Sequence, residues 1–226
     1  MKPLFISVLS VLFFGFCSAL SAQQNTFNAG MKLGVAGTQI SGDGFAGFRK
    51  AGLVGGVFVS RQFNERWGGL MEIQYVRKGS FDPPDPENGK FDQYKIDLQY
   101  VEIPLMATFE LSQFHWEAGL SIGYLFAHRQ EDEFGPIRDE NISRLIEMRD
   151  LDFSLNIGLN FQASERLYLN VRYNHSVYPI ANTPQWVTGY VGFFGGSYNQ
   201  TLQFSLGYHI LGRNHFYQTS DRQKSF

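Results

Sequence analysis

Residues 151–162 read Leu-Asp-Phe-Ser-Leu-Asn-Ile-Gly-Leu-Asn-Phe-Gln and alternate without a break between apolar and small or polar side chains. In a strand, successive side chains point to opposite faces, so the apolar residues of this segment share one face and the polar residues share the other. A helix would mix the two sets around its circumference. The segment is therefore predicted to be a strand with one apolar face.

The same alternation recurs along the chain from residue 27 onward. Seven further segments follow it: 27–40, 51–62, 67–78, 94–109, 116–128, 167–178 and 198–211. The connections are alternately long (41–50, 79–93, 129–150 and 179–197) and short (63–66, 110–115 and 163–166). Eight strands joined in this way are typical of a barrel with two unlike ends. We therefore predict an all-β fold, an eight-stranded antiparallel up-and-down β-barrel.

The fourth of these segments changes phase at its centre. Apolar residues occupy even positions from Tyr94 to Tyr100 and odd positions from Val101 to Phe109. A one-residue β-bulge near Tyr100 and Val101 would place both sets on the same face of the sheet. We expect such a bulge in this strand.

The composition limits the class of function. The 226 residues carry 19 Lys and Arg against 21 Asp and Glu, which is a formal net charge of −2, and only 18% of residues are charged. A nucleic-acid-binding domain needs a basic surface that this balance does not provide. We therefore expect no nucleic-acid partner.

The amino-terminal segment has the pattern of a secretory signal peptide. Lys2 precedes an apolar run over 4–16, and the small residues of 18–22 follow it. This order predicts cleavage after Ala22, so the protein leaves the cytoplasm. Cleavage also removes Cys17, the single cysteine, and with it any disulfide or cysteine metal site. We expect a signal peptide over 1–22, a barrel over 23–211 and a short periplasmic tail over 212–226.

Alternation alone does not distinguish a membrane barrel from a soluble barrel such as a lipocalin, which is apolar inside and polar outside. In this chain the polar face is small and weakly charged, with residues such as Gly34, Ser121 and Asn156. Small side chains suit a narrow eight-stranded lumen, whereas a water-exposed exterior would carry Lys and Glu. The polar face therefore favours the membrane barrel, with its apolar face toward lipid.

Aromatic residues gather near both ends of the apolar face, as in the interfacial girdles of outer-membrane barrels. They are Phe27, Phe63, Trp67, Phe109, Trp116 and Phe161 near the short turns, and Tyr75, Tyr94, Phe126, Tyr173 and Tyr198 near the long loops. We therefore predict a transmembrane barrel in the cell outer membrane. Its expected partners are outer-membrane lipid and lipopolysaccharide, and the barrel-assembly machinery during insertion.

Four charged residues have the parity of the predicted lumen: Lys32, Glu72, Glu102 and Arg172. An isolated charge inside a narrow barrel is very costly, so these groups should pair with one another. The prediction is a structural network of ion pairs in a packed polar lumen that it closes. The alternative is a path or gate for protons or ions.

Several of these segments resemble a known family. Residues 71–79 (MEIQYVRKG) and 100–106 (YVEIPLM) are similar to two strands of the PorT-like outer-membrane β-barrel family of Bacteroidota, and 30–34 and 206–208 resemble its opening and closing strands. The resemblance implies an outer-membrane barrel of the cell envelope. Because the namesake of that family serves type IX secretion, it also implies an alternative role as an accessory of a secretion or uptake machine.

A lipid A-modifying barrel would use His and Ser as catalytic residues. His175 and Ser176 are adjacent, and adjacent strand residues point to opposite faces, so they cannot form a nucleophile–base pair. His128 has the lipid-facing parity, His209 the lumen parity, and His115 falls in a predicted turn. No catalytic triad or metal-ligand spacing occurs. We predict no enzyme activity, cofactor or metal, with lipid A modification as the alternative.

The long loops are the candidate contact sites. The charged loop 129–150 could meet lipopolysaccharide or a divalent ion, or could be only a solvated loop. The loop 179–197 is instead aromatic and rich in Gly, and an exposed apolar loop can bind a partner. Its candidate contact residues are Trp186, Tyr190, Phe193 and Phe194. The predicted function is a non-enzymatic envelope role, structural or in binding another envelope protein.

Overall fold

The computed structural model describes residues 27–42, 47–89, 91–137, 147–182 and 195–211. They form β1 (Phe27–Ser41), β2 (Lys50–Gln62), β3 (Trp67–Asp82), the short 3-10 helix η1 (Pro86–Asn88), β4 (Tyr94–Leu111), β5 (Phe114–Asp132), β6 (Gly135–Pro136), β7 (Leu151–Gln162), β8 (Leu167–Ser176) and β9 (Tyr198–Leu211). The predicted signal peptide and periplasmic tail lie outside the described residues. No helix among the described residues is long and apolar enough to cross a membrane.

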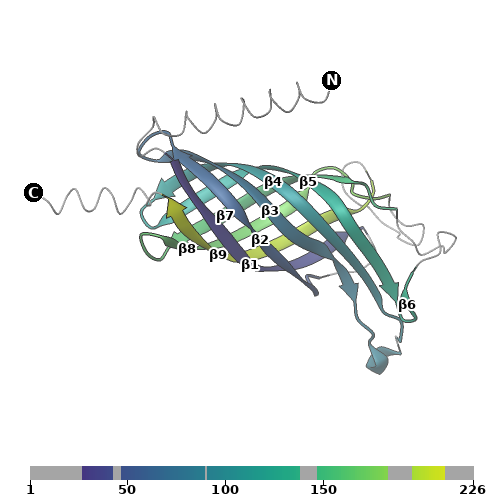
Figure 1. Cartoon of the computed structure of the whole chain (residues 1–226). Helices are drawn as coiled ribbons and strands as arrows, with labels where there is room; N and C mark the ends of the chain where they lie inside the picture. The colour runs from purple at the N-terminus through teal and green to yellow at the C-terminus, as the bar shows by residue number, and fades with distance from the viewer. Residues whose placement is uncertain (1–26, 43–46, 90, 138–146, 183–194, 212–226) are drawn as a thin grey trace, which may run out of the picture.

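The eight long strands close into a ring of antiparallel pairs, which confirms the predicted fold (Figure 1). Each strand pairs with the next along the chain, β5 pairs with β7, and β9 returns to pair with β1 over Ala29–Ser41. The two-residue β6 pairs antiparallel with Glu131 and Asp132 at the end of β5 and is not part of the ring. Because the ring has no free edge, every strand is hydrogen-bonded on both sides, as a span through lipid requires.

Along β7 the apolar side chains lie outside the barrel and the polar side chains lie inside, as predicted. Leu155 and Ile157 are 52% and 54% exposed on the outside, whereas Ser154 and Asn156 are each 1% exposed inside. The other strands repeat this arrangement, with Leu33, Leu53, Ile73, Leu105, Ile122, Val171 and Leu206 among the exposed apolar residues. The barrel thus has an apolar outer surface around an interior that contains most of its polar groups.

The bulge lies in the strand next to the predicted one. Gln99 pairs with Ala127 and Tyr100 with Leu125, so the extra residue is Phe126 of β5. Alternation in β4 is therefore unbroken, and the two apolar sets of that strand lie on opposite faces. Val101 is exposed outside, whereas Tyr100 is buried inside. The prediction that both sets share a face was wrong because the lumen itself is apolar at this end.

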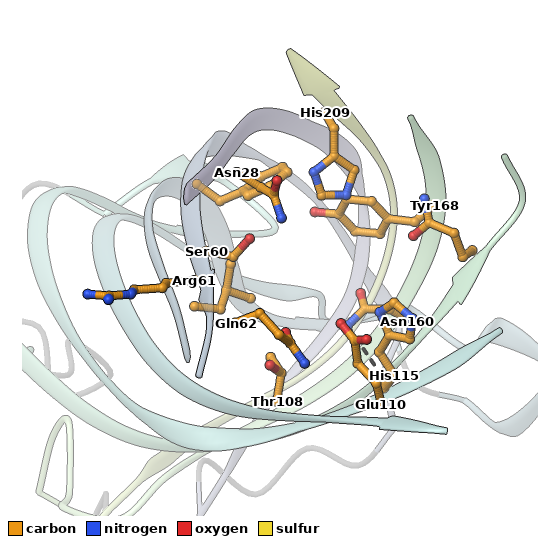
Figure 2. Close-up of a pocket in the computed structure, with 13 residues that line it drawn as sticks. Asn28, Ser60, Arg61, Gln62, Thr108, Glu110, His115, Asn160, Tyr168 and His209 are labelled. Atoms are coloured by element: carbon orange, nitrogen blue, oxygen red, sulfur yellow. Dashed lines mark hydrogen bonds between the residues drawn. The ribbon is translucent and has the colours of Figure 1, made fainter. Parts of the chain in front are cut away.

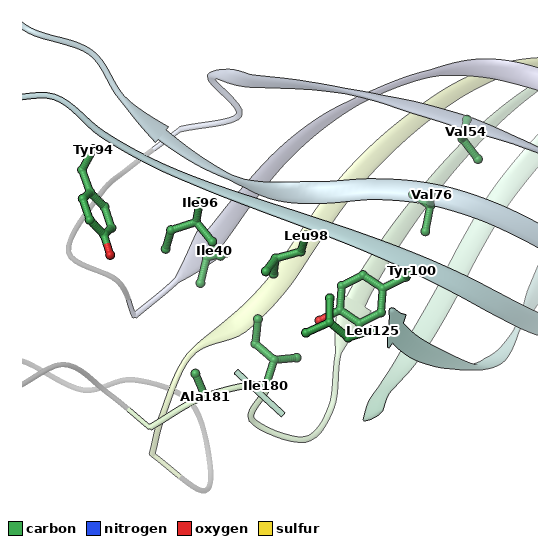
Figure 3. Packing of buried hydrophobic residues seen from close by; sticks show 10 residues of the cluster. All are labelled: Ile40, Val54, Val76, Tyr94, Ile96, Leu98, Tyr100, Leu125, Ile180 and Ala181. Atoms are coloured by element: carbon green, nitrogen blue, oxygen red, sulfur yellow. The ribbon is translucent and has the colours of Figure 1, made fainter. Parts of the chain in front are cut away.

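The outer part of the lumen is filled by a cluster of apolar side chains, here named the outer plug (Figure 3). Its buried members are Ile40, Val54, Val76, Tyr94, Ile96, Leu98, Tyr100, Leu125, Ile180 and Ala181. Ile180 and Ala181 follow β8 and enter the mouth of the barrel, where the Ile180 amide donates to the Ser197 carbonyl over 2.8 Å. The prediction of a lumen packed only with polar groups is therefore wrong at this end. Tyr94 and Tyr198, predicted in the outer girdle, are also buried.

The two ends of the barrel differ as predicted. Short turns over 63–66, 112–113 and 163–166 lie at the end where β1 begins and β9 ends (Figure 1). In two of these turns a side chain caps the backbone, since Asn64 Oδ1 accepts from the Trp67 amide and Ser164 Oγ from the Leu167 amide. At the other end β3, β4 and β5 continue well past their neighbours and carry η1 and β6 (Figure 1). In outer-membrane barrels the short turns are periplasmic, so the long strands point outward.

Candidate functional site

A buried ion network occupies the middle of the lumen, on strands β1, β3, β5 and β8. The Arg172 guanidinium donates to Glu72 through Nη1 (2.7 Å) and Nη2 (2.9 Å), and through Nε to Glu117 Oε1 (2.6 Å). Lys32 Nζ lies 2.5 Å from Glu72 Oε2. Two cations thus face two carboxylates, and the network is neutral as a whole. We name these four residues the inner network.

Amide side chains complete the hydrogen bonding around Glu117. Asn170 Nδ2 donates to Glu117 Oε1 and Asn160 Nδ2 donates to Glu117 Oε2, each over 2.9 Å. Asn170 Nδ2 also donates to Asn160 Oδ1 over 2.8 Å. A buried carboxylate is tolerated only when its remaining lone pairs are satisfied in this way.

A second buried network lies nearer the outer plug and centres on Lys78. Its ammonium pairs with Glu102 and with Asp152 (3.0 Å), and it donates to Asn174 Oδ1 over 2.9 Å. The Asp152 carboxylate also accepts from Ser176 Oγ over 2.7 Å. The Lys78 ammonium lies 5.3 Å from the ring centre of Tyr100, which joins this network to the plug. We name Lys78, Glu102 and Asp152 the outer network.

The predicted lumen residues are divided between these two networks. Lys32, Glu72 and Arg172 lie together, although Glu72 and Arg172 are 100 residues apart in the chain, whereas Glu102 pairs with Lys78. Sequence reasoning missed Glu117, Lys78 and Asp152. All three have the lumen parity of their strands, so the alternation that identified the first four could also have found them.

The periplasmic end of the lumen holds a small pocket of about 60 Å³ (Figure 2). Its polar lining comes from several strands and includes Asn28, Ser60, Gln62, Thr108, Glu110, His115, Asn160, Tyr168 and His209. Since one water needs about 10–15 Å³ of such volume, the pocket has room for a few waters and is too small for an organic substrate. His115, predicted in a turn, is instead a buried strand residue of β5.

Three aromatic rings also line this pocket, from β2, β8 and β9. Phe58 meets Tyr168 and His209 edge-on, with ring centres 5.6 and 5.2 Å apart. The Tyr168 ring packs against the backbone of Gly207 and the Phe58 ring against that of Gly30. Neither glycine could carry a side chain, since a Cβ would lie 2.0 Å from the Tyr168 ring or 2.5 Å from the Phe58 ring. The small lumen residues noted in the sequence therefore make room for buried rings.

His175 and Ser176 lie on opposite faces of the barrel wall, as expected for adjacent strand residues. Ser176 is buried inside and donates to Asp152, whereas the ring of His175 stacks between Tyr173 and Tyr198 at 6.3 and 6.1 Å. His128 is exposed on β5. Among the described residues, no group of three or more His, Cys, Asp or Glu side chains is placed to hold a metal ion.

The candidate contact residues Trp186, Tyr190, Phe193 and Phe194 lie outside the described residues. The same is true of 138–146 in the charged loop. What the structure describes at the outer end is therefore the strand extensions, with Phe91 after η1 and Phe134 between β5 and β6. Both of these aromatic side chains are exposed.

Comparison with solved structures returns other barrels of outer membranes. Ail, the attachment invasion locus protein of Yersinia pestis, is 13% identical, with a TM-score of 0.45 over 83% of this chain and 100% of that chain. Neisserial surface protein A is 13% identical, with a TM-score of 0.48 over 81% of this chain and 97% of that one. The outer membrane protein OprG from Pseudomonas aeruginosa is 11% identical, with a TM-score of 0.38 over 82% and 96%.

No curated protein sequence matches this chain. A family match is nevertheless clear, since the family described as "outer membrane protein beta-barrel domain" matches residues 21–182. That range contains seven of the eight barrel strands and every residue of the two ion networks. The chain therefore belongs to the outer membrane protein beta-barrel domain family.

Proposed function

We propose that this protein is a non-enzymatic component of the outer membrane whose role, structural or in binding another envelope component, is carried out at its outer end. The observation that carries the proposal is the filled lumen. The outer plug and the two ion networks occupy the interior along most of its length. In the part of the chain that the structure describes, these groups obstruct the path along the barrel axis, which supports a role on its surface.

The strand extensions support the outer end as the place of contact. β3 and β5 have 16 and 19 residues, against 10 in β8, and their extra residues project past the membrane-facing surface (Figure 1). Phe91 and Phe134 near the tips are 72% and 90% exposed. Aromatic residues are enriched in the binding surfaces of proteins. Two exposed rings near the tips of the strand extensions therefore suit a contact with another envelope component.

Conductance across a planar bilayer tests the closed lumen. The purified barrel should give no stable channel steps, because both the apolar plug and the ion pairs obstruct the path. Truncating the plug alone, with Leu98→Ala and Tyr100→Ala together, should still give no conductance, because the ion pairs of the two networks remain in the path. Heat-modifiable migration on a gel verifies that folded barrels are present in the membrane. Channel steps from the unmodified protein would overturn the proposal of a closed barrel.

Photo-crosslinking in intact cells tests the contact role. A photoreactive residue at position 91 or 134 should crosslink to one recurring envelope component. Phe63 in a periplasmic turn is the matched control, since it too is an exposed Phe at a barrel end. Equal yields of crosslinked product at positions 63, 91 and 134, or no product at positions 91 and 134, would contradict an outer contact site.

Within the family, we propose the PorT-like branch of Bacteroidota, supported by the sequences of 71–79 and 100–106, which lie on the paired strands β3 and β4. This assignment favours one second candidate, an accessory role in secretion or uptake. A deletion strain separates the two roles: loss of secreted proteins from the medium would favour the accessory role, and an unchanged secretome the contact role. An altered lipid A mass spectrum in the same strain would instead reveal an enzyme.

A further inference from the structure

A basic cavity lies on the outside of the barrel at its outer end, between β2, β3 and β4. Its volume is about 270 Å³. The described residues that line it are Arg49, Lys50, Ala51, Arg77, Phe81 and Lys95, so four of the six are cations and none is a carboxylate. This concentration is unusual in a chain whose formal net charge is −2.

Two of the cations, Lys50 and Arg77, are held in place by the buried carboxylate of Asp97. Asp97 of β4 accepts from Arg77 Nε over 2.7 Å and pairs with Lys50 Nζ at 3.0 Å. The Lys50 ammonium also donates to the Lys78 carbonyl over 2.9 Å. Asp97 is buried, whereas the Arg77 side chain remains 39% exposed. One carboxylate thus positions two cations and neutralises only one of them.

The other two cations are less constrained. Lys95 lies 3.6 Å from Glu131, an ion pair in which the lysine side chain is 40% exposed. Arg49 is exposed. Exposed ion pairs contribute little and are easily exchanged for another anion. The cavity therefore presents positive charge in excess, on groups that can turn toward a ligand.

The cavity begins where the apolar surface ends. On β3, Arg77 is the next outward position after Tyr75, and on β2, Ala51 is the next after Leu53. Phe81 and Lys95 are opposite each other across the β3–β4 pair, two outward positions beyond Arg77. Tyrosine residues mark the level of the headgroups in outer-membrane barrels. The cationic side chains thus lie at and just above the headgroups of the outer leaflet.

We propose that this cavity binds phosphate groups carried by the glycolipid of the outer leaflet, the phosphorylated lipid A region of lipopolysaccharide. Arginine and lysine side chains are the usual protein partners of phosphate, and the guanidinium offers several donors in one plane. At about 270 Å³ the cavity is just below the size of pockets that enclose a whole small molecule, so it suits one phosphorylated group of a larger lipid. The proposal concerns lipid rather than a protein partner, and it requires only that the barrel lies in the outer membrane.

Lipid binding by the full-length mature barrel in nanodiscs tests the proposal. The probes are bisphosphorylated lipid A, the same lipid with both phosphates removed, and free inorganic phosphate. The test variant combines Arg49→Gln and Lys95→Gln, which leaves Asp97 and its two partners intact. The control combines Arg66→Gln and Arg166→Gln, two exposed arginines in periplasmic turns, so that the net charge changes equally. Heat-modifiable migration on a gel verifies that each variant is folded.

The test variant should bind bisphosphorylated lipid A about 30-fold more weakly, since each cation near the membrane surface contributes about fivefold to binding of anionic lipid. The control should differ by less than about twofold, and exchange of the cations (Arg49→Lys with Lys95→Arg) should restore binding. Unchanged affinity in the test variant, equal loss in the control, or equal binding of dephosphorylated lipid would overturn the site. Inorganic phosphate that binds as tightly as the lipid would overturn the lipid assignment.

Discussion

Replacing Arg172 by methionine should strongly destabilise the barrel. The side chain is 1% exposed and its guanidinium donates three charge-assisted hydrogen bonds, of 2.6, 2.7 and 2.9 Å, to Glu72 and Glu117. In Arg172→Met these two buried carboxylates share the single cation of Lys32. Breaking a buried ion network by removing one partner costs about 3–5 kcal/mol, so we expect a loss of that size in the free energy of unfolding.

A second variant restores the charge balance and tests the cause. Arg172→Met with Glu117→Gln leaves one carboxylate and one cation, Glu72 and Lys32, at 2.5 Å. The combined variant should lose only about 2 kcal/mol, because the uncompensated charge is gone and what remains is imperfect packing and hydrogen bonding. The two substitutions would then be strongly non-additive.

Urea unfolding of the barrel in lipid vesicles, followed by tryptophan fluorescence and by gel migration, measures these differences. Arg166→Met, which removes an exposed arginine in a periplasmic turn, is the control and should stay within about 0.5 kcal/mol of the parent. The reasoning fails if Arg172→Met costs less than about 1 kcal/mol, or if adding Glu117→Gln makes the barrel less stable still.

Three further outcomes follow from the packing of the lumen. Gly207→Ala should destabilise the barrel by about 2 kcal/mol or more, since its Cβ would lie 2.0 Å from the Tyr168 ring. Gly55→Ala on the outer surface should be nearly neutral, because its Cβ would meet the end of the Leu33 side chain at 3.2 Å and the Lys32 carbonyl oxygen at an ordinary contact distance of 3.6 Å; equal midpoints in urea for the two variants would contradict this. Lys78→Met should cost about 3–5 kcal/mol in the same assay, because it leaves two carboxylates buried without their cation, and a stable variant would show that the outer network is dispensable. Raising NaCl from about 0.05 to 0.5 M should change the unfolding free energy by less than about 1 kcal/mol, because buried pairs are poorly screened; a large loss would place the stabilising pairs at the surface.

Much of the fold is predictable because a strand in a barrel wall has a strict period of two. The strand β7, for example, begins and ends at the residues where its alternation begins and ends, Leu151 and Gln162. The pairing of strands is less predictable. Arg172 of β8 is opposite Gln203 of β9, and this follows from the register of the two strands, which alternation does not specify.

The errors have a common physical cause. Alternation assigns a residue to one of two faces, but it identifies the inner face only when that face is polar. In the outer half of β4 both faces are apolar, so alternation predicts Tyr94 on the lipid side, whereas the structure buries it in the plug. The phase change in β4 likewise predicts a bulge in that strand, whereas the extra residue is Phe126 of the neighbouring strand β5.

The sequence by itself determined that this chain forms strands with one apolar face, how many cross the barrel wall, and, wherever the inner face is polar, which residues lie in the lumen, because backbone geometry and the solvent on each side impose those patterns locally. Only the tertiary structure decided which lumen charges meet. Arg172 reaches Glu72 and Glu117, while Glu102 joins Lys78 and Asp152. The tilt and stagger of strands in a closed barrel set the height of each side chain along the axis, and those quantities belong to the whole ring rather than to any one segment.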